Sequence, residues 1–399
     1  MSQRIRARGI RDDHVYSEDA DGLTVSHKRH TLPSEIIERT SDMRIAVYGA
    51  SGYTGKLVVA ELARREIDMV LVGRNVERLR EAAAGAGRAR AGGAESRRAE
   101  ADDHVALVHA FQDCAAVINC AGPFVLSGEA IVRAAITVGC HYVDIAGEQR
   151  HLKRIFDTFA ASAEAAGVTV VPGTNDDGLP GDLLAHLVAE RVRPVRELVV
   201  GLELVRSGAM PSRGTLRSAL ESIDTFTGGG LGYQDGRWDA NIAARRTALT
   251  FPDGSDPVPV VKFPLPAVIT VPRHVAARRV EGVAKAELVA AFADIAPAVI
   301  DSVPEGPPAE NRHAARWIIV VEAIGEDDRH ARGVVQGTDM QGSTAVIAVE
   351  SARRLVADGA KPGVLAPAQA YAPADFLEFL VQHGVHWSLD VTDSTGDAR

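Results

Sequence analysis

The sequence is poor in cysteine and in long apolar runs, and it has no excess of basic over acidic residues. Its three cysteines, Cys114, Cys120 and Cys140, are too few and too irregularly spaced for a disulfide framework or a CxxC metal site, so a reducing compartment suits the chain and no metal site is expected. No apolar run approaches the about 18 residues of a membrane-spanning helix, and charges occupy the N-terminal positions where a signal peptide needs its apolar stretch. We therefore expect a cytoplasmic protein without integral membrane association.

The net charge and the length of the chain indicate which partners and how many domains to expect. The chain has 44 Lys and Arg against 53 Asp and Glu, a formal net charge of -9. This leaves no basic footprint to neutralise a phosphate backbone, so no nucleic-acid partner is expected. A single hydrophobic core stops growing at about 250–300 residues, and the 399 residues of this chain therefore predict two domains.

The pattern of the chain changes at three places. Residues 1–42 mix basic and acidic residues with little apolar periodicity, which predicts a flexible tail, or alternatively a targeting or binding arm. From residue 43 strands alternate with helices, and after residue 182 Gly-rich and Pro-rich segments separate sparser strands. The expected segments are a flexible N-terminal tail at 1–42, an α/β domain at 43–182, an α+β substrate and dimerisation domain at 183–340, and C-terminal helices returning toward the first domain at 341–399.

Hydrophobic spacing predicts the individual elements. In the first part, strands are expected at 45–48, 69–72, 97–101, 116–120, 141–145 and 168–171, with helices between them at 54–65, 74–84, 103–111, 129–138 and 149–166. The second part has a helix at 183–191, a strand at 197–205, a helix at 285–293, a β-hairpin formed by 316–324 and 331–337, and helices at 344–357 and 374–382. This order predicts an α/β fold with a Rossmann-type doubly wound parallel sheet, joined to a second α+β domain.

A glycine-rich turn lies between the first strand and the first helix. Gly49, Gly52 and Gly55 follow the spacing G-x-x-G-x-x-G, in which the first glycine permits a tight turn, the second a close approach of the backbone to a pyrophosphate, and the third close packing of helix on strand. The free N–H groups and positive dipole end of the helix attract the same anion, and Ser51 and Thr54 add hydroxyl donors. The turn therefore predicts dinucleotide binding.

The residues after the second strand indicate which dinucleotide binds. An NAD site usually has Asp or Glu about 20 residues after the glycines, whereas an arginine suits a 2'-phosphate. Here the strand is followed by Arg74 and Asn75, so NADP(H) is the expected cofactor and 43–182 the expected NADP-binding Rossmann domain. The alternative for Arg74 is a surface arginine on a connecting loop. A P-loop is excluded because Gly55-Lys56 is followed by Leu57 rather than Ser or Thr.

The loop after the fourth strand, residues 119–124 (NCAGPF), borders the crevice at the carboxyl edge of a parallel sheet, where cofactor and substrate meet. Cys120 within it is interpreted as a small core residue rather than a nucleophile, because no histidine has a position that suggests a base for it.

Taken in order, these motifs resemble the saccharopine dehydrogenase-like family, including its trans-acting enoyl reductase branch. The resemblance rests on residues 49–55 (GASGYTG), 73–75 (GRN), 117–124 (VINCAGPF), 141–148 (HYVDIAGE), 177–182 (DGLPGD), 214–218 (GTLRS) and 361–365 (KPGVL). It implies hydride transfer to or from a nicotinamide, a second domain that shapes the substrate site, often a homodimer, and Asp102 as an adenine contact. One departure is Asp176, where the family more often has an aromatic residue, so the pocket there is expected to be more polar.

Motifs and resemblance together define the expected cofactor site. Its residues are Gly49, Ser51, Gly52, Tyr53, Thr54, Gly55, Arg74, Asn75, Asp102, Asn119, Ala121, Gly122, Pro123 and Phe124.

Acidic residues follow the fifth and sixth strands and should meet at the same sheet edge, facing the nicotinamide. Asp144, Glu148 and Asp177 are the catalytic candidates, because carboxylates beside a hydride donor stabilise a cationic iminium and one with a raised pKa delivers a proton. Each has an alternative role: Asp177, like Asp182, as a cap of the helix after it, and Glu148 as a cap of the helix near 149. The carboxylates favour C=N reduction, whereas residues 214–218 look closer to the enoyl reductase branch.

The expected protein is an NADPH-dependent oxidoreductase acting on a C=N or conjugated C=C bond of a small metabolite or lipid precursor. The alternative from another class is a non-catalytic NADP(H)-binding sensor or scaffold. A short-chain dehydrogenase is disfavoured because its Tyr-x-x-x-Lys pair is missing: Ala146 stands where Tyr142 would need the lysine, and Arg237 where Tyr233 would need it.

Overall fold

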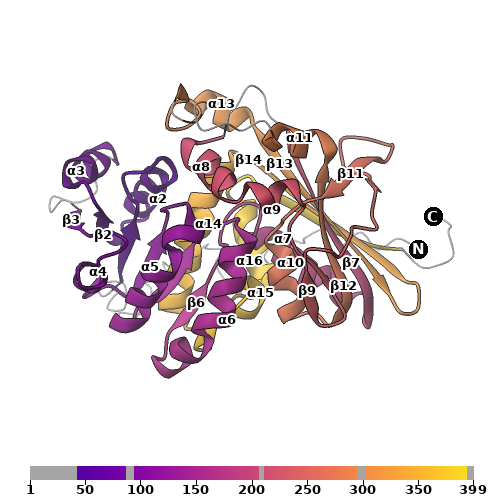
Figure 1. Cartoon of the computed structure of the whole chain (residues 1–399), viewed down its shortest axis with the longest axis horizontal. Coiled ribbons are helices and arrows are strands. Elements are labelled where there is room, and N and C mark those ends of the chain that lie inside the picture. The colour runs from indigo at the N-terminus through magenta and orange to yellow at the C-terminus, as the bar shows by residue number, and fades with distance from the viewer. Residues whose placement is uncertain (1–42, 87–93, 206–210, 294–299, 301, 393–399) are drawn as a thin grey trace, which may run out of the picture.

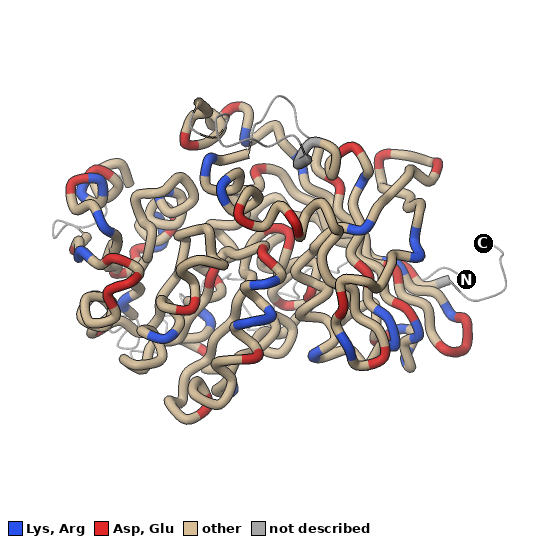
Figure 2. The backbone as a smooth tube through the Cα atoms, in the orientation of Figure 1, with Lys and Arg blue, Asp and Glu red and all other residues tan. Residues whose placement is uncertain are grey.

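The computed structural model describes residues 43–86, 94–205, 211–293, 300 and 302–392. The predicted tail at 1–42 lies outside these ranges. Two β-sheets lie side by side, the first with its helices at the left of Figure 1 and the larger second sheet at the right. In the view of Figure 2, basic and acidic positions are interspersed over both parts.

The first sheet has seven parallel strands in the order β15-β6-β5-β4-β1-β2-β3. Its main strands are β1 (Arg44–Tyr48), β2 (Asp68–Gly73), β3 (Glu95–Arg98), β4 (Ala116–Asn119), β5 (His141–Asp144) and β6 (Thr169–Val171). The connecting helices are α2 (Tyr53–Arg64), α3 (Val76–Gly85), α4 (His104–Phe111), α5 (Phe124–Val138) and α6 (Gln149–Ala165). Strand order reverses between β1 and β4, which places the binding crevice of a doubly wound sheet at their carboxyl ends.

The strands of this sheet are apolar at nearly every position because both faces are covered by helices. Ile45 and Val47 point into a core shared with α2 and α3, whereas Ala46 and Tyr48 point into the core under α4, α5 and α6. Successive residues of a strand face opposite sides of the sheet. The continuous apolar runs seen in the sequence are therefore the mark of a sheet between two helical layers.

The second sheet is mixed, in the order β10-β11-β12-β7-β13-β14-β16, with β8 pairing to β12 and β9. Its strands before the C-terminal segment are β7 (Val195–Val205), β8 (Gly232–Gln234), β9 (Arg237–Asp239), β10 (Ala248–Leu249), β11 (Val258–Lys262), β12 (Ala277–Lys285), β13 (Arg316–Gly325) and β14 (His330–Thr338). The helices around it are α7 (Leu179–Glu190), α8 (Arg213–Glu221), α9 (Ile223–Thr227), α10 (Ala267–Thr270), the short 3-10 helix η1 (Val271–Arg273), α11 (Ala286–Ala293) and α13 (Ala309–Ala314). β13 and β14 form the antiparallel hairpin that the sequence predicts, and α7 packs on both.

Strand β12 is missing from the sequence prediction because charged residues interrupt its apolar pattern. Arg279 and Glu281 are each only 5% exposed and pair with each other inside the sheet. Arg279 also donates to the side-chain oxygen of Gln234 and the backbone oxygen of Ala243. Buried charges are tolerated where such partners satisfy them, and those partners are distant in sequence.

The C-terminal segment contributes to both sheets. α14 (Met340–Ala357) packs on α2, β15 (Gly363–Val364) extends the first sheet beside β6, and β16 (His386–Thr392) pairs with β14 in the second. α15 (Pro367–Ala370) and α16 (Pro373–Val381) lie between these strands. The two strands were not predicted, and the domain limits at 182 and 340 stay predictions. The predicted fold class, a Rossmann-type doubly wound sheet with a second α+β domain, is confirmed.

Candidate functional site

The turn between β1 and α2 is shaped by close backbone contacts. Gly49 has a φ of +79°, and a Cβ there would lie 2.9 Å from the Cβ of Ala121. A Cβ on Gly55 would lie 2.2 Å from the carbonyl oxygen of Gly49, so α2 can start this close to the turn only with glycine. Gly52, the N-cap of α2, is exposed and brings no capping side chain. The first N–H groups of α2 thus remain available to an anion, and the turn fits a pyrophosphate.

A groove of about 610 Å³ runs along this turn and past the ends of β2 and β4 to α8. Most of the predicted cofactor residues line it: Gly49, Ser51, Gly52, Tyr53, Thr54, Arg74, Asn75, Asp102, Ala121, Gly122 and Pro123. The sequence motifs thus meet in one continuous surface whose size suits a dinucleotide.

Three predicted cofactor residues lie elsewhere. Gly55 is buried under the turn, where it serves packing. Asn119 is fully buried, and its side chain accepts from the N–H of Ala121 at 3.0 Å and donates to the hydroxyl of Tyr142 at 3.0 Å, so it supports the loop after β4. Phe124 faces the neighbouring cavity described below.

Arg74 is exposed at the carboxyl end of β2, and no residue that the structure describes holds its guanidinium in an ion pair or hydrogen bond. Asn75 caps α3 by accepting from the N–H of Arg78 at 3.0 Å. The position of Arg74 on the groove suits a 2'-phosphate, which needs a cation that is not already neutralised.

The groove also contains charged residues that the sequence analysis did not identify: Arg78, Glu100, Arg213, Arg217 and Glu305. A signal existed for Arg78, because it stands four residues after Arg74 at the start of a helix, a spacing that puts two side chains on one face. Arg217 lies within the motif at 214–218, which had been noted only for the resemblance. No sequence signal pointed to Glu305, which reaches the groove from a distant part of the chain.

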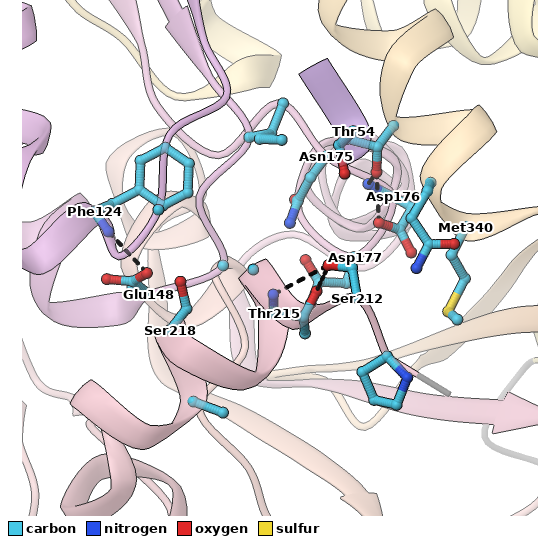
Figure 3. Close-up of a pocket in the computed structure, with 18 of the residues that line it drawn as sticks. Thr54, Phe124, Glu148, Asn175, Asp176, Asp177, Ser212, Thr215, Ser218 and Met340 are labelled. Atoms are coloured by element: carbon cyan, nitrogen blue, oxygen red, sulfur yellow. Dashed lines mark hydrogen bonds between the residues drawn. The ribbon is translucent and has the colours of Figure 1, made fainter. Parts of the chain in front are cut away.

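A second cavity, of about 220 Å³, adjoins the groove and shares Thr54, Cys120 and Gly122 with it. Figure 3 shows this cavity with acidic and hydroxyl side chains along its wall. Its apolar lining comes from both parts of the chain and includes Phe124, Ile145, Leu202, Leu204, Phe226, Phe263, Pro264 and Met340. The cavity therefore combines a polar end with an apolar wall next to the carboxyl end of β4.

Two consecutive aspartates after β6 form the acidic end of the cavity. Asp176 accepts from the hydroxyl of Thr344 on α14 at 2.7 Å, and its own N–H donates to that hydroxyl oxygen at 3.2 Å. The buried Oδ1 of Asp177 has no hydrogen-bond partner in the part of the chain that the structure describes. Burial raises the pKa of both carboxyls, and the charge of Asp177 further raises the pKa of Asp176. The pair thus retains a proton at higher pH than ordinary aspartates do.

The capping role considered for Asp177 does not appear. The N-cap of α7 is Gly178, and no side chain caps that helix end. Asp182 is buried and interacts with His274 Nε2 at 3.0 Å and the N–H of Ala368 at 2.8 Å instead. The first of these contacts lowers the pKa of Asp182 against the effect of its burial.

The carboxylates of the other two catalytic candidates accept hydrogen bonds from backbone N–H groups. Glu148 lines the cavity, but its two oxygens accept from the N–H groups of Phe124 at 3.0 Å and Val125 at 2.7 Å, so it caps α5 rather than the helix near 149. The structure does not bring Asp144 to the cavity. That side chain is fully buried, accepts from the N–H of Gly173 at 2.9 Å and contacts His151 Nε2 at 2.7 Å, because the last residue of β5 points to the face of the sheet that α6 covers.

Cys120 lies where groove and cavity meet. Burial, with a smaller contribution from the charge of Asp144, raises the pKa of its thiol. A thiol that stays protonated is a poor nucleophile, in agreement with the interpretation of Cys120 as a packing residue.

Fold and site together define a class: a dinucleotide-binding Rossmann protein in which a second domain completes a small cavity at the crevice. Residues 45–171 match the family model for the saccharopine dehydrogenase NADP binding domain. The resemblance to the saccharopine dehydrogenase-like family is thereby confirmed, and the match identifies this part of the chain as an NADP-binding domain.

Similar proteins agree with this assignment. A lipid droplet localized protein of Caenorhabditis elegans is 32% identical over 146 residues, which are 35% of this chain and 34% of that protein. A saccharopine dehydrogenase-like oxidoreductase of Rattus norvegicus is 28% identical over 214 residues, 50% of this chain and 45% of the relative. A trans-acting enoyl reductase of Mycobacterium ulcerans is 28% identical over 156 residues, 38% and 36% of the two chains. The alignments thus span less than half of each relative.

The likeness of fold extends further along the chain. Apo saccharopine dehydrogenase (L-Glu forming) from Saccharomyces cerevisiae superposes with a TM-score of 0.57 at 14% identity, over 88% of this chain and 100% of that one. Across the described ranges, no helix is both long and apolar enough to cross a bilayer. The homodimer and the cytoplasmic location stay predictions.

Proposed function

We propose that the protein is an NADPH-dependent reductase of a C=N bond in a small metabolite. The observation that carries the proposal is the buried Oδ1 of Asp177, which lies in a cavity adjoining the dinucleotide groove. This oxygen forms no hydrogen bond of ordinary geometry with any described residue, although the side chain of Asn175 is near enough to lower the pKa of the carboxyl. A buried acceptor without a partner is costly to the fold, and a substrate N–H would satisfy it. When bound in the groove, the nicotinamide supplies the hydride.

The aspartate pair suits the proton transfer that this reaction requires. The raised pKa of Asp176 and Asp177 keeps one proton on the pair toward neutral pH. That proton can pass to an imine nitrogen, and the carboxylate left behind stabilises the iminium cation until a hydride reaches its carbon. Asp177 is the expected proton donor, because Asp176 is already bonded to Thr344.

The cavity wall favours a second candidate, reduction of a conjugated C=C bond in a lipid precursor. Leu202, Phe226, Phe263 and Met340 give it an extended apolar lining, and one relative carries the name trans-acting enoyl reductase. Hydride addition to such a bond creates an enolate, which a carboxylate opposes unless it is protonated. With one proton the aspartate pair still keeps one negative charge beside the developing enolate, and this charge ranks the reaction second.

The test follows NADPH consumption by its near-ultraviolet absorbance with two acceptor panels, cyclic imines and α,β-unsaturated thioesters. Asp177→Asn should lower turnover of the imines by at least about a hundredfold, the lower end for a lost general acid, with unchanged NADPH affinity. The matched control is Asp157→Asn, on the exposed face of α6, where the carboxylate pairs with Lys153; it should leave turnover unchanged.

Each other outcome has a defined meaning. Near-normal turnover of Asp177→Asn would remove Asp177 from the chemistry. Consumption with the thioesters alone would favour the second candidate. Tight NADPH binding without turnover of any acceptor would support the sensor or scaffold alternative, for which the structure offers no separate observation.

A further inference from the structure

A segment of the second domain crosses the dinucleotide groove. We define residues 303–312 as the strap. It includes the first residues of α13 and lies near α8, at the top of Figure 1. The hydroxyl of Tyr53 donates to the carbonyl oxygen of Pro307 at 2.6 Å. Gly306 packs so closely on the ring of Tyr53 that a Cβ there would lie 2.4 Å from it. The strap thus contacts the glycine-rich turn directly, through Tyr53.

The strap brings one carboxylate into the groove. Glu305 lines the groove, and its side chain pairs with Lys56 Nζ at 2.9 Å and with the guanidinium of Arg78. The hydrogen bond from Lys56, and then the charges of Arg78 and Arg213, hold the pKa of Glu305 below its usual range. This carboxylate is therefore ionised at neutral pH and neutralises cations on both helices that flank the turn.

The backbone around Glu305 is fixed from α8. The N–H of Arg213 donates to the carbonyl oxygen of Glu305 at 3.0 Å, and Nε of Arg213 donates to that of Val303 at 3.1 Å. Figure 2 shows basic positions on α8. An acidic side chain is thus held among basic ones at the place where the fold expects an anionic cofactor.

The cations that Glu305 engages lie close to the position expected for a 2'-phosphate. Arg78 lies in the first turn of α3, four residues after Arg74, which precedes the N-cap Asn75. The guanidinium of Arg78 also approaches the carbonyl oxygen of Ser51, in the turn, at 3.5 Å. Arg74, Arg78 and Ser51 line the same groove. A phosphate at this point would meet two guanidinium groups, one without a described partner and one held by Glu305.

We infer that Glu305 is an internal anion that competes with the 2'-phosphate of NADP(H) for Arg78, which makes Arg78 a second specificity-determining residue beside Arg74. The inference depends on the NADP-binding assignment and not on the reaction proposed above. A phosphate carries more charge than a carboxylate and forms several charge-assisted hydrogen bonds, so the cofactor displaces Glu305 from Arg78 at a cost. That cost lowers affinity for NADP(H), while the hydrogen bond from Tyr53 to Pro307 keeps the strap on the turn.

The experiment measures binding to the full chain by calorimetry, with 2',5'-ADP and 5'-AMP as fragments that differ in the 2'-phosphate. Glu305→Gln should bind 2',5'-ADP about three- to fivefold more tightly than the wild type, since the upper end of the strengths measured for exposed ion pairs converts to this range. Binding of 5'-AMP should change by less than about twofold. The matched control, Glu310→Gln, lies exposed on α13 and should leave both affinities unchanged.

A double-mutant cycle completes the test. Arg78→Gln should weaken 2',5'-ADP binding, and in that background Glu305→Gln should have a smaller effect than in the wild type. Unchanged or weaker 2',5'-ADP binding by Glu305→Gln would overturn the inference and leave the strap as a clamp. Equal tightening for 5'-AMP, or the same effect in Glu310→Gln, would also overturn it. None of these readouts depends on turnover, so a failed reductase proposal would leave the result intact.

Discussion

Gly52 and Gly55 belong to the same turn, yet alanine at the two positions should have opposite consequences for fold and cofactor. At Gly55 a methyl group would lie 2.2 Å from the carbonyl oxygen of Gly49 and 3.0 Å from the Cα of Ala50. Backbone atoms cannot yield as a side chain does, so we take the upper part of the about 1–3 kcal/mol range for overpacking. The better helix propensity of alanine offsets about 1 kcal/mol. The expected net loss is about 2 kcal/mol of unfolding free energy.

At Gly52 the same change leaves the fold nearly intact. The residue is exposed, has an ordinary φ of -74°, and its new Cβ would meet only the carbonyl oxygen of Gly49, at 3.2 Å. The methyl group would instead occupy the groove against the pyrophosphate. The unfolding free energy of Gly52→Ala should therefore lie within about 1 kcal/mol of the wild-type value, the range for a change at an N-cap. It should bind NADPH at least about tenfold more weakly, a loss of about 1.4 kcal/mol.

Urea unfolding and NADPH titration on both variants separate the two roles. A Gly52→Ala variant with wild-type affinity would mean that the cofactor does not approach this residue. A Gly55→Ala variant with wild-type stability would refute the packing argument for the third glycine.

Other expectations follow from the same features. Arg74→Asp should abolish a ten- to hundredfold preference for NADPH over NADH, the range for a charge-assisted hydrogen bond of about 1.5–3 kcal/mol; equal binding of both cofactors by the wild type would contradict it. Because burial raises the pKa of Asp176 and Asp177 in the folded state, the contribution of these two carboxyls to the unfolding free energy falls as pH rises from about 4 toward neutrality. The unfolding free energy of Asp177→Asn should accordingly rise relative to that of the wild type as pH increases from about 4 toward neutrality. A difference in urea unfolding that does not change with pH would contradict the raised pKa values. A chain that starts at Met43 should keep the melting temperature and NADPH affinity of the full chain, since 1–42 offer few apolar side chains to a core; a large fall in either would show that the segment docks.

The local spacing of apolar residues was sufficient to predict the strands and helices of the first domain. Strands buried on both faces read as unbroken apolar runs, and amphipathic helices between them repeat their apolar residues at helical spacing, so their positions follow from the sequence. The helix expected at 129–138 is instructive, because in the structure it begins earlier, at Phe124. Its first N–H groups are capped by Glu148 from another loop, a contact that no local pattern contains.

The sequence by itself determined the glycine turn between β1 and α2, the position of Arg74 after β2 and the sheet edge to which the acidic residues belong, because each depends on residues adjacent in the chain. Only the tertiary structure decided which acids face the cavity. Asp144 ends a strand with its side chain buried between the sheet and α6, whereas Asp177 lies in a loop and its Oδ1 has no hydrogen-bond partner among the described residues. Likewise, Glu305 reaches Lys56 from 249 positions away. Side-chain direction and long-range contacts arise from packing between elements, which the order of residues in a single segment does not encode.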